Sequence, residues 1–290
     1  MPEGKYIMAR KKFCELNLTH AFMFAAAMTD PVVFRVTLEV LLGKTVKKVN
    51  VNVEHSLLFS SDSRNIRLDV YGDDETDEYN VEMQGEDEGN LPKRSRYHQA
   101  EMDVLALEPG DDFNKLKPNT VMFICNFDPF GDGLYQYTYR NICVENGREL
   151  GDETTKLFFN IQGRNPENTP QTVINLLKYM ADTTDECEQS LGDVNVSLIH
   201  KHVTALKRSR EWEMKYMRFD ELLKKEKDAG YMQGHADGHA AGHAAGEADM
   251  LELITKMLAA GEEDKVKLLA EDAGLLAKMR EKYLTTKEEV

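Results

Sequence analysis

The chain has 290 residues, of which 41% are hydrophobic and 30% charged, so the composition predicts a globular core joined to a charged helical part. Its net charge of −15 argues against general affinity for nucleic acids, and any nucleic-acid site must be local. We find no apolar run near the roughly 20 residues of a membrane span, no secretory signal and no zinc-binding cysteine pair. We therefore expect a cytoplasmic protein with reduced thiols and no membrane partner.

The first predicted element is a buried helix over Val32–Leu42. Thr29-Asp30-Pro31 supplies a cap residue and a proline at its start, and Gly43 ends it. Glu39 is an acidic residue within this otherwise apolar helix. It either lies at an exposed position or reaches the polar face of the neighbouring sheet.

A first strand is predicted at Val46–Val53, closed by Glu54, and Ile66–Gln84 then predicts a hairpin in which polar and apolar residues alternate in both arms. Two carboxylates that face each other across such a hairpin repel unless something compensates. A divalent cation is one compensation, and a sheet face exposed to water is the alternative. Pairing Asp69 with Glu82 gives one apolar face and one face that carries Arg67, Asp69, Asn80, Glu82 and Gln84.

Pro92 opens a predicted helix over Lys93–Leu107 whose first turn is cationic, with Lys93, Arg94 and Arg96. The N-terminus of a helix prefers anions, so this turn indicates either an external anion or local ion pairs with the acidic residues just before it. Further strands are predicted at Thr120–Phe127, Tyr135–Val144 and Leu157–Ile161. The core thus reads helix, three strands, helix, strand.

The C-terminal part is predicted to be helical, with helices over Thr172–Ala181, Val194–Lys227, Met250–Leu258 and Val266–Leu276. Glycine recurs every fourth residue from Gly230 to Gly246, a period that one helix can accommodate. The repeat suggests a helical linker or an oligomerisation spacer, and a partner helix packed along the glycines would stabilise it. The alternative is a transition-metal site made by the histidines within the repeat, His235, His239 and His243.

Two stretches in this order and spacing resemble one known family. They are RLDVYGDDETDEYNVEMQGEDEGNLPKRSRYHQAEMD and TVMFICNFDPFGDGLYQYTYRNIC. They resemble the PD-(D/E)xK nuclease family transposases, also called the Rpn family of recombination-promoting nucleases. The resemblance covers roughly residues 13–230, and the glycine repeat is similar to the family's repetitive C-termini.

The resemblance implies an α/β fold with a restriction-endonuclease-like mixed sheet flanked by helices (an α-β-β-β-α-β core) and a helical C-terminal extension. The expected domains are residues 13–190 and 191–290, with the tetrad repeat at 230–249. Such nucleases hold Mg²⁺ on two acidic residues and a backbone carbonyl, which here are Asp69, Glu82 and Met83. Glu39 is the match for a further acidic ligand from the first helix, with Glu54 in reserve.

Position 84 carries glutamine where the superfamily usually has lysine. Glutamine cannot act as an ammonium, so a metal would have to lower the pKa of the attacking water largely by itself, with Gln84 orienting that water. Lys93, Arg94, Arg96 and Arg67 are the predicted contacts to DNA phosphates.

The implied function is a Mg²⁺-dependent DNA endonuclease of recombination or mobile DNA, with Mn²⁺ as a substitute metal. The alternative is a catalytically weak nuclease-fold protein that binds DNA and associates with itself through its C-terminal helices.

Overall fold

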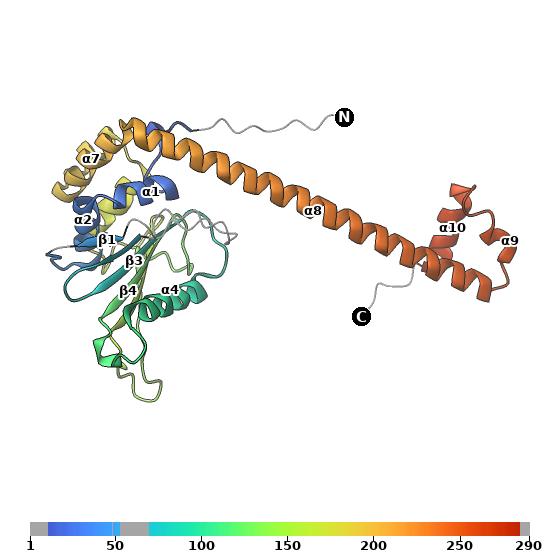
Figure 1. The fold of residues 1–290 in the computed structure, drawn as a ribbon, viewed down its shortest axis with the longest axis horizontal. Helices are drawn as coiled ribbons and strands as arrows, with labels where there is room; N and C mark the ends of the chain where they lie inside the picture. The colour runs from blue at the N-terminus through green and yellow to red at the C-terminus, as the bar shows by residue number, and fades with distance from the viewer. Residues whose placement is uncertain (1–10, 48, 53–69, 285–290) are drawn as a thin grey trace. The chain divides into compact units, whose positions relative to one another are not determined.

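The computed structural model describes residues 11–47, 49–52 and 70–284 (Figure 1). These residues form two compact units, one ending at Tyr216 and one beginning at Met217. The boundary lies later than the one predicted at residue 190, because α7 (Val194–Lys207) packs against α2 (Pro31–Leu42) and α5 (Gln171–Ala181) of the first unit.

The first unit begins with η1 (Phe13–Glu15) and α1 (Ala21–Met28), followed by α2. α2 begins and ends as the sequence predicts. The Asp30 carboxylate accepts a hydrogen bond from the Val32 N–H at 2.8 Å, and Pro31 fills the first turn. Gly43 ends the helix with a φ of 64°, a left-handed conformation that favours glycine.

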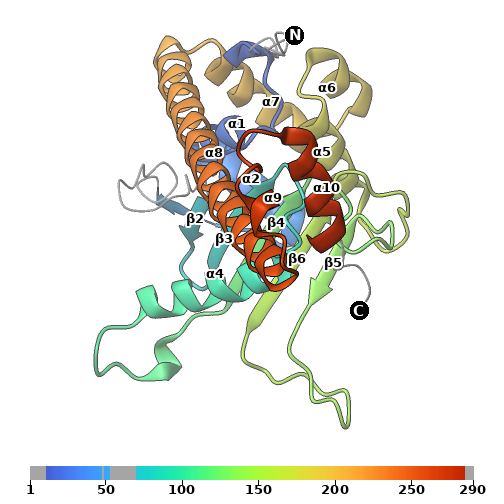
Figure 2. The ribbon, with the colours of Figure 1, turned by 90° about the vertical axis from the view of Figure 1, so that its right-hand side faces the viewer.

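A six-stranded mixed sheet forms the centre of this unit, in the order β1-β2-β3-β4-β6-β5 (Figure 2). β1, β2 and β3 pair antiparallel, β3, β4 and β6 pair parallel, and β5 pairs antiparallel with β6. The first part of the chain therefore follows the predicted order of helix, three strands, helix and strand. The strands are β1 (Asn50–Asn52), β2 (Val70–Asp73), β3 (Glu78–Gln84), β4 (Asn119–Cys125), β5 (Gln136–Tyr139) and β6 (Thr154–Asn160).

The described part of the hairpin has the predicted register, with Val70 opposite Val81 and Tyr71 opposite Asn80. β2 continues to Asp73 and β3 begins at Glu78, so residues 74–77 form the turn. Asp69 lies outside the described residues, as do the other predicted hairpin residues before Val70.

Two predicted strands are shorter than their sequence patterns suggest. Within the described residues, β1 is only Asn50–Asn52, and β5 ends at Tyr139 rather than at Val144. Pairing of β5 with β6 ends at Tyr139, opposite Lys156, and the chain beyond it forms a turn closed by a single bridge between Ile142 and Glu149.

Helices cover both faces of the sheet (Figure 1). α1 contacts β3 and α2 contacts β1 on one face, while α4 (Leu91–Ala106) contacts β4 on the other. The α4 face includes Phe123, which stacks on Phe158 with ring centroids 5.4 Å apart. Cys125 is buried there, and burial together with the nearby Glu82 carboxylate raises the pKa of its thiol to about 12.

The single long helix predicted over Val194–Lys227 is wrong. α7 ends at Lys207 and α8 (Arg210–Ala259) begins after a break in which Ser209 Oγ accepts a hydrogen bond from the Trp212 N–H at 3.4 Å. A serine before a helix competes for backbone hydrogen bonds and favours a new start. The sequence analysis also missed α6 (Asp185–Leu191).

The second unit contains the rest of α8, α9 (Glu263–Val266) and α10 (Ala273–Leu284). The glycine tetrads lie within α8, so the prediction that they continue as one helix is confirmed. The helix predicted over Val266–Leu276 is wrong, since turns separate α9 from α10. A small apolar core of Leu253, Met257, Leu269 and Met279 joins these helices.

Among the described residues, no single helix has both the length and the apolar composition of a membrane span. α1 and α2 reach those limits only when counted together, as a pair bent by 105°.

Gly72 should tolerate no side chain, because a Cβ built on it would lie 2.3 Å from Cε1 of Phe34 in α2. We expect Gly72→Ala to lower the free energy of unfolding by about 1–3 kcal/mol, the usual range for overpacking, as measured by urea denaturation. Gly85→Ala is the matched control, since a Cβ there meets nothing within 4 Å. Adding Phe34→Leu to Gly72→Ala should restore part of the loss, and an unchanged midpoint for Gly72→Ala would contradict the packing argument.

Candidate functional site

The polar residues of β3 are buried under α4. Asn80, Glu82 and Gln84 alternate along the strand and are only 0%, 5% and 7% exposed. Buried polar groups are costly unless they are paired, so their partners define the chemistry of this face. The polar face predicted from the alternation is therefore covered by a helix rather than by water.

Arg94, in the first turns of α4, reaches down to this strand. Its Nη2 donates to Glu82 Oε1, and its Nη1 donates to Gln84 Oε1 at 3.0 Å. Gln84 Nε2 in turn donates to Glu82 Oε1 at 2.5 Å. The guanidinium also lies 5.9 Å from the centre of the Phe123 ring. One arginine thus neutralises the carboxylate and orients the amide beside it.

His98, one helical turn after Arg94, contacts the other oxygen of the same carboxylate. Its Nε2 lies 3.2 Å from Glu82 Oε2, within ion-pair distance but without the geometry of a hydrogen bond. On the other side of the ring, Nδ1 lies 3.4 Å from the Tyr71 hydroxyl and 3.6 Å from Glu101 Oε2. Tyr71 also donates to Glu101 at 3.0 Å, so β2, β3 and α4 all contribute to this cluster.

Hydrogen bonds from two other residues fix α4 over the sheet. Gln99 Nε2 donates to Asn119 Oδ1 at 2.9 Å, and Asn119 Nδ2 donates to Asp103 Oδ1 at 2.7 Å. Gln99 belongs to the same RSRYHQ run as Arg94 and His98. We conclude that this part of the run holds the helix in the orientation that lets Arg94 and His98 reach Glu82.

The described residues supply part of what a divalent cation requires. Glu82 provides a buried carboxylate whose Oε2 accepts no hydrogen bond, and both side-chain polar atoms of the fully buried Asn80 on the same face lack a partner. Among the described residues no group of three or more His, Cys, Asp or Glu side chains is placed to hold a metal. Asp69, the second predicted carboxylate, lies outside them, so the fit depends on that residue.

The other predicted site residues are distributed as follows. Lys93 and Arg96 are exposed residues of α4 on either side of Arg94 in the sequence. Glu88 lies 3.8 Å from Arg94, so the local ion pairing weighed as an alternative is present in part. Met83 lies on β3 with its side chain on the face opposite Glu82. Arg67 and Glu54 lie outside the described residues.

The structure does not bring Glu39 together with Glu82. α2 covers the opposite face of the sheet, where Phe34 approaches Gly72. Glu39 Oε2 lies 2.9 Å from Arg35 Nη1, and Oε1 accepts a hydrogen bond from the Val46 N–H at 3.1 Å. Its carboxylate therefore ties the chain after α2 to that helix, which explains an acidic residue in an apolar pattern without a metal.

The sequence analysis missed His98, Tyr71 and Glu101 as members of the cluster. The spacing of Arg94, His98 and Glu101, at i, i+4 and i+7, would have placed all three on one helix face. Tyr71 follows the alternation of β2 and could have been assigned to the polar face by the predicted register.

The DPFG segment after β4 is organised around the Asp128 carboxylate. It accepts hydrogen bonds from the Gly131 N–H at 3.0 Å, the Gly133 N–H at 2.7 Å and the Tyr137 hydroxyl at 2.6 Å. Partial burial acts to raise the pKa of Asp128, but these hydrogen bonds outweigh it and hold the pKa below its ordinary value. Phe130 from the same loop packs edge-on against Phe158, so the carboxylate anchors the loop to the α4 face.

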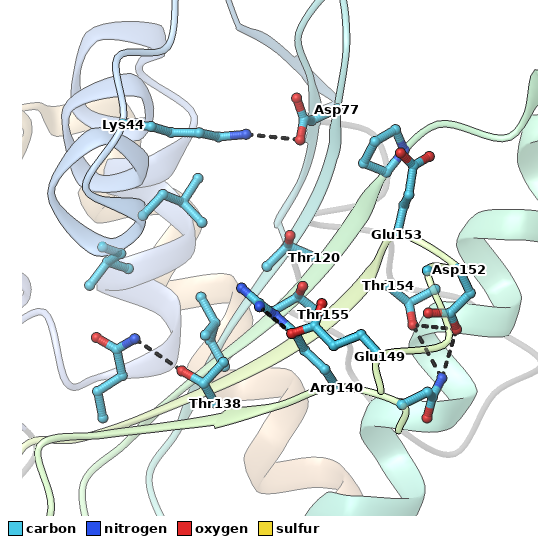
Figure 3. Close-up of a pocket in the computed structure, with 17 residues that line it drawn as sticks. Lys44, Asp77, Thr120, Thr138, Arg140, Glu149, Asp152, Glu153, Thr154 and Thr155 are labelled. Carbon is cyan, nitrogen blue, oxygen red and sulfur yellow. Dashed lines mark hydrogen bonds and ion pairs between the residues drawn. The ribbon is translucent and has the colours of Figure 1, made fainter. Parts of the chain in front are cut away.

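A separate pocket of about 530 Å³ lies on the α2 side of the sheet (Figure 3). Threonines from three strands form its floor, and both of its cations are paired, Lys44 with Asp77 and Arg140 with Glu149. Among the described residues that line it, none is Glu82 or another predicted site residue.

The histidines of the glycine repeat lie along α8, where the rings of His235 and His239 are 6.3 Å apart. Neither takes part in a group of three possible metal ligands among the described residues. The alternative of a transition-metal site in the repeat is therefore without support from the part of the chain that the structure describes.

Comparisons of the chain with protein-family models, with curated proteins and with solved structures gave no match. The resemblance drawn from the sequence motifs therefore stays a prediction.

The ion pair between Arg94 and Glu82 should be measurable as a coupling free energy between mutations of the two residues. Arg94→Ala leaves Glu82 buried without its cation, and we expect a loss of about 1–3 kcal/mol in the free energy of unfolding. Glu82→Gln should make the same arginine change less costly, so that a double-mutant cycle by urea denaturation gives a coupling of about 1–2 kcal/mol. Arg96→Ala, an exposed neighbour, should stay within about 0.5 kcal/mol of the wild type. Strict additivity would refute the interaction.

Asp128 should make stability depend on acid pH. The pKa of Asp128 in the folded state lies below its ordinary value of 3.8. The ionised carboxylate therefore stabilises the folded state at pH values above 3.8, and this contribution is lost as the pH falls through the lower pKa of the folded state. We expect Asp128→Asn to cost about 1–2 kcal/mol at neutral pH. The difference from the wild type should shrink below pH 3.8. Asp132→Asn, exposed in the same loop, is the control, and a pH-independent difference would argue against the carboxylate.

Proposed function

We propose that the protein is a Mg²⁺-dependent DNA endonuclease with a restriction-endonuclease-like fold, acting in recombination or on mobile DNA. The observation that carries the proposal is the buried carboxylate of Glu82 on a polar strand face, with the cationic first turns of α4 directly beside it. The motif resemblance supports the same assignment, as does the order of α2, the three strands, α4 and β4.

In this proposal, Asp69, Glu82 and the backbone carbonyl of Met83 hold the metal. When bound, Mg²⁺ or Mn²⁺ would lower the pKa of a water and neutralise phosphate charge. Gln84 supplies an amide beside Glu82 that orients the water by hydrogen bonding. Arginine binds phosphate through parallel N–H groups, so Arg94, and with it the exposed Lys93 and Arg96, positions the DNA backbone together with Arg67.

A DNA-binding protein with little catalysis is the second candidate. One observation favours it: Arg94 and Gln84 engage one oxygen of Glu82, and His98 lies against the other. A carboxylate that is already neutralised has less need of a metal.

Self-association through the C-terminal helices belongs to this second candidate as well. A Cβ placed on any of the five repeat glycines, Gly230, Gly234, Gly238, Gly242 or Gly246, would meet nothing within 4 Å. In the described chain, nothing covers this stripe of small residues, so a second helix can approach it closely.

Plasmid nicking separates the two candidates. We expect the purified protein to nick supercoiled plasmid with Mg²⁺ or Mn²⁺, and both Asp69→Ala and Glu82→Ala to lose about 100-fold or more of the rate, since each removes charge that holds the metal. The control is Glu167→Ala, an exposed carboxylate outside the cluster.

Equal nicking by all variants would mean that a contaminating nuclease is responsible and would sink the catalytic assignment. No nicking by the wild type, combined with DNA binding that weakens on Lys93→Ala, would favour the second candidate.

A further inference from the structure

We propose that Arg94 couples DNA binding to metal binding at Glu82. In the free protein its guanidinium occupies the carboxylate, and a backbone phosphate that takes over the guanidinium makes the carboxylate available to the divalent cation. The inference rests on the proposed function and adds a regulatory contact to that site: affinity for the metal is low until DNA is present.

The contact that must break is specific to this arginine. Arg94 Nη2 donates to Glu82 Oε1 while Nη1 donates to Gln84 Oε1 at 3.0 Å, so the guanidinium spans the two side chains that the proposal assigns to metal binding and to the water. A cation in this position repels a second cation approaching the same oxygen. The two therefore compete for Glu82, and removing one should favour the other.

Arg94 is also the member of the cluster that can be withdrawn. Its side chain is 29% exposed, against 7% for Glu82 and 3% for His98. Lys93 and Arg96 are exposed in the same helix turns, and their charge draws a phosphate to this end of α4, where the exposed part of the guanidinium can bind it. Arginine matches phosphate in the same paired geometry that it uses for a carboxylate.

Replacing the Arg94 guanidinium beside Glu82 by a metal cation costs less free energy than withdrawing it alone. Glu82 is buried, and a buried carboxylate without a cation is strongly destabilising. If one cation replaces another, the carboxylate never remains unpaired. His98 Nε2 lies 3.2 Å from Oε2 on the far side, so Glu82 keeps one neighbour that restrains its orientation while Arg94 is withdrawn.

Two measurable consequences follow from linkage between the two cations. Removing the guanidinium should strengthen metal binding in the absence of DNA, and DNA should strengthen metal binding only when the guanidinium is present. The effect of DNA should be reciprocal, with the metal strengthening DNA binding by the same factor.

The test is calorimetric titration of the intact protein with Mn²⁺, without DNA and with a short phosphorothioate duplex that resists cleavage. We expect Arg94→Gln to bind Mn²⁺ about tenfold more tightly than the wild type without DNA, within the usual range of such couplings. The duplex should tighten Mn²⁺ binding by the wild type and leave Arg94→Gln nearly unchanged.

Arg164→Gln is the control, because it removes an exposed arginine outside the cluster without touching Glu82. It should leave Mn²⁺ affinity without DNA at the wild-type value. Arg94→Lys keeps a charge but loses the two-sided contact, so its affinity should fall between the wild type and Arg94→Gln. Circular dichroism shows whether Arg94→Gln folds, and Arg94→Lys replaces it in the titration if it does not.

The outcomes separate this inference from the proposed function. In one outcome, the wild type binds Mn²⁺, Glu82→Gln does not, and Arg94→Gln and Arg94→Lys bind Mn²⁺ no more tightly than the wild type. This result would refute the coupling and leave the metal site standing. If the wild type, the two Arg94 variants and Glu82→Gln all fail to bind Mn²⁺ with and without the duplex, the metal site is refuted and the coupling with it.

Discussion

The feature on which the rest of the first unit depends is the burial of one carboxylate between a sheet and a helix. Glu82 lies in the middle of β3, and α4 covers it. A buried carboxylate is tolerated only with a cation and oriented hydrogen bonds close by. This one requirement accounts for the position of α4, for the polar residues of its inner face and for the tyrosine of β2.

The interface between α4 and the sheet is divided accordingly. Toward its start, Arg94 and His98 face the polar part of β3, and beyond them Gln99 and Asp103 bond to Asn119 at the start of β4. The apolar contacts of the same face lie on β4 and β6, where Phe123 and Phe158 stack. A purely apolar helix could not pack here, and the weak amphipathic pattern of α4 in the sequence reflects its mixed interface.

Local rules predicted the elements that depend on few neighbours. The cap at Asp30, the stop at Gly43 and the register of β2 against β3 follow from residue chemistry and period-2 alternation, and each is present in the structure. Periodicity alone extended two elements too far, because it does not detect the serine that starts a new helix at Ser209, and because the end of β5 at Tyr139 depends on what packs alongside. Glu39 failed as a site prediction for the same reason: the sequence places it on α2 but does not say which face of the sheet α2 covers.

The glutamine at position 84 gains a physical meaning from its neighbours. Its amide donates to Glu82 through Nε2 and accepts from Arg94 through Oε1, so it joins the carboxylate to the cation. A lysine at this position would bring a second positive charge against Arg94 and compete for the same oxygen. Glutamine can use both ends of its amide, which an ammonium, having only donors, cannot. In this chain the cation beside Glu82 comes from the helix rather than from the strand. It therefore lies nearer to solvent and to the exposed basic turn than a lysine on β3 would.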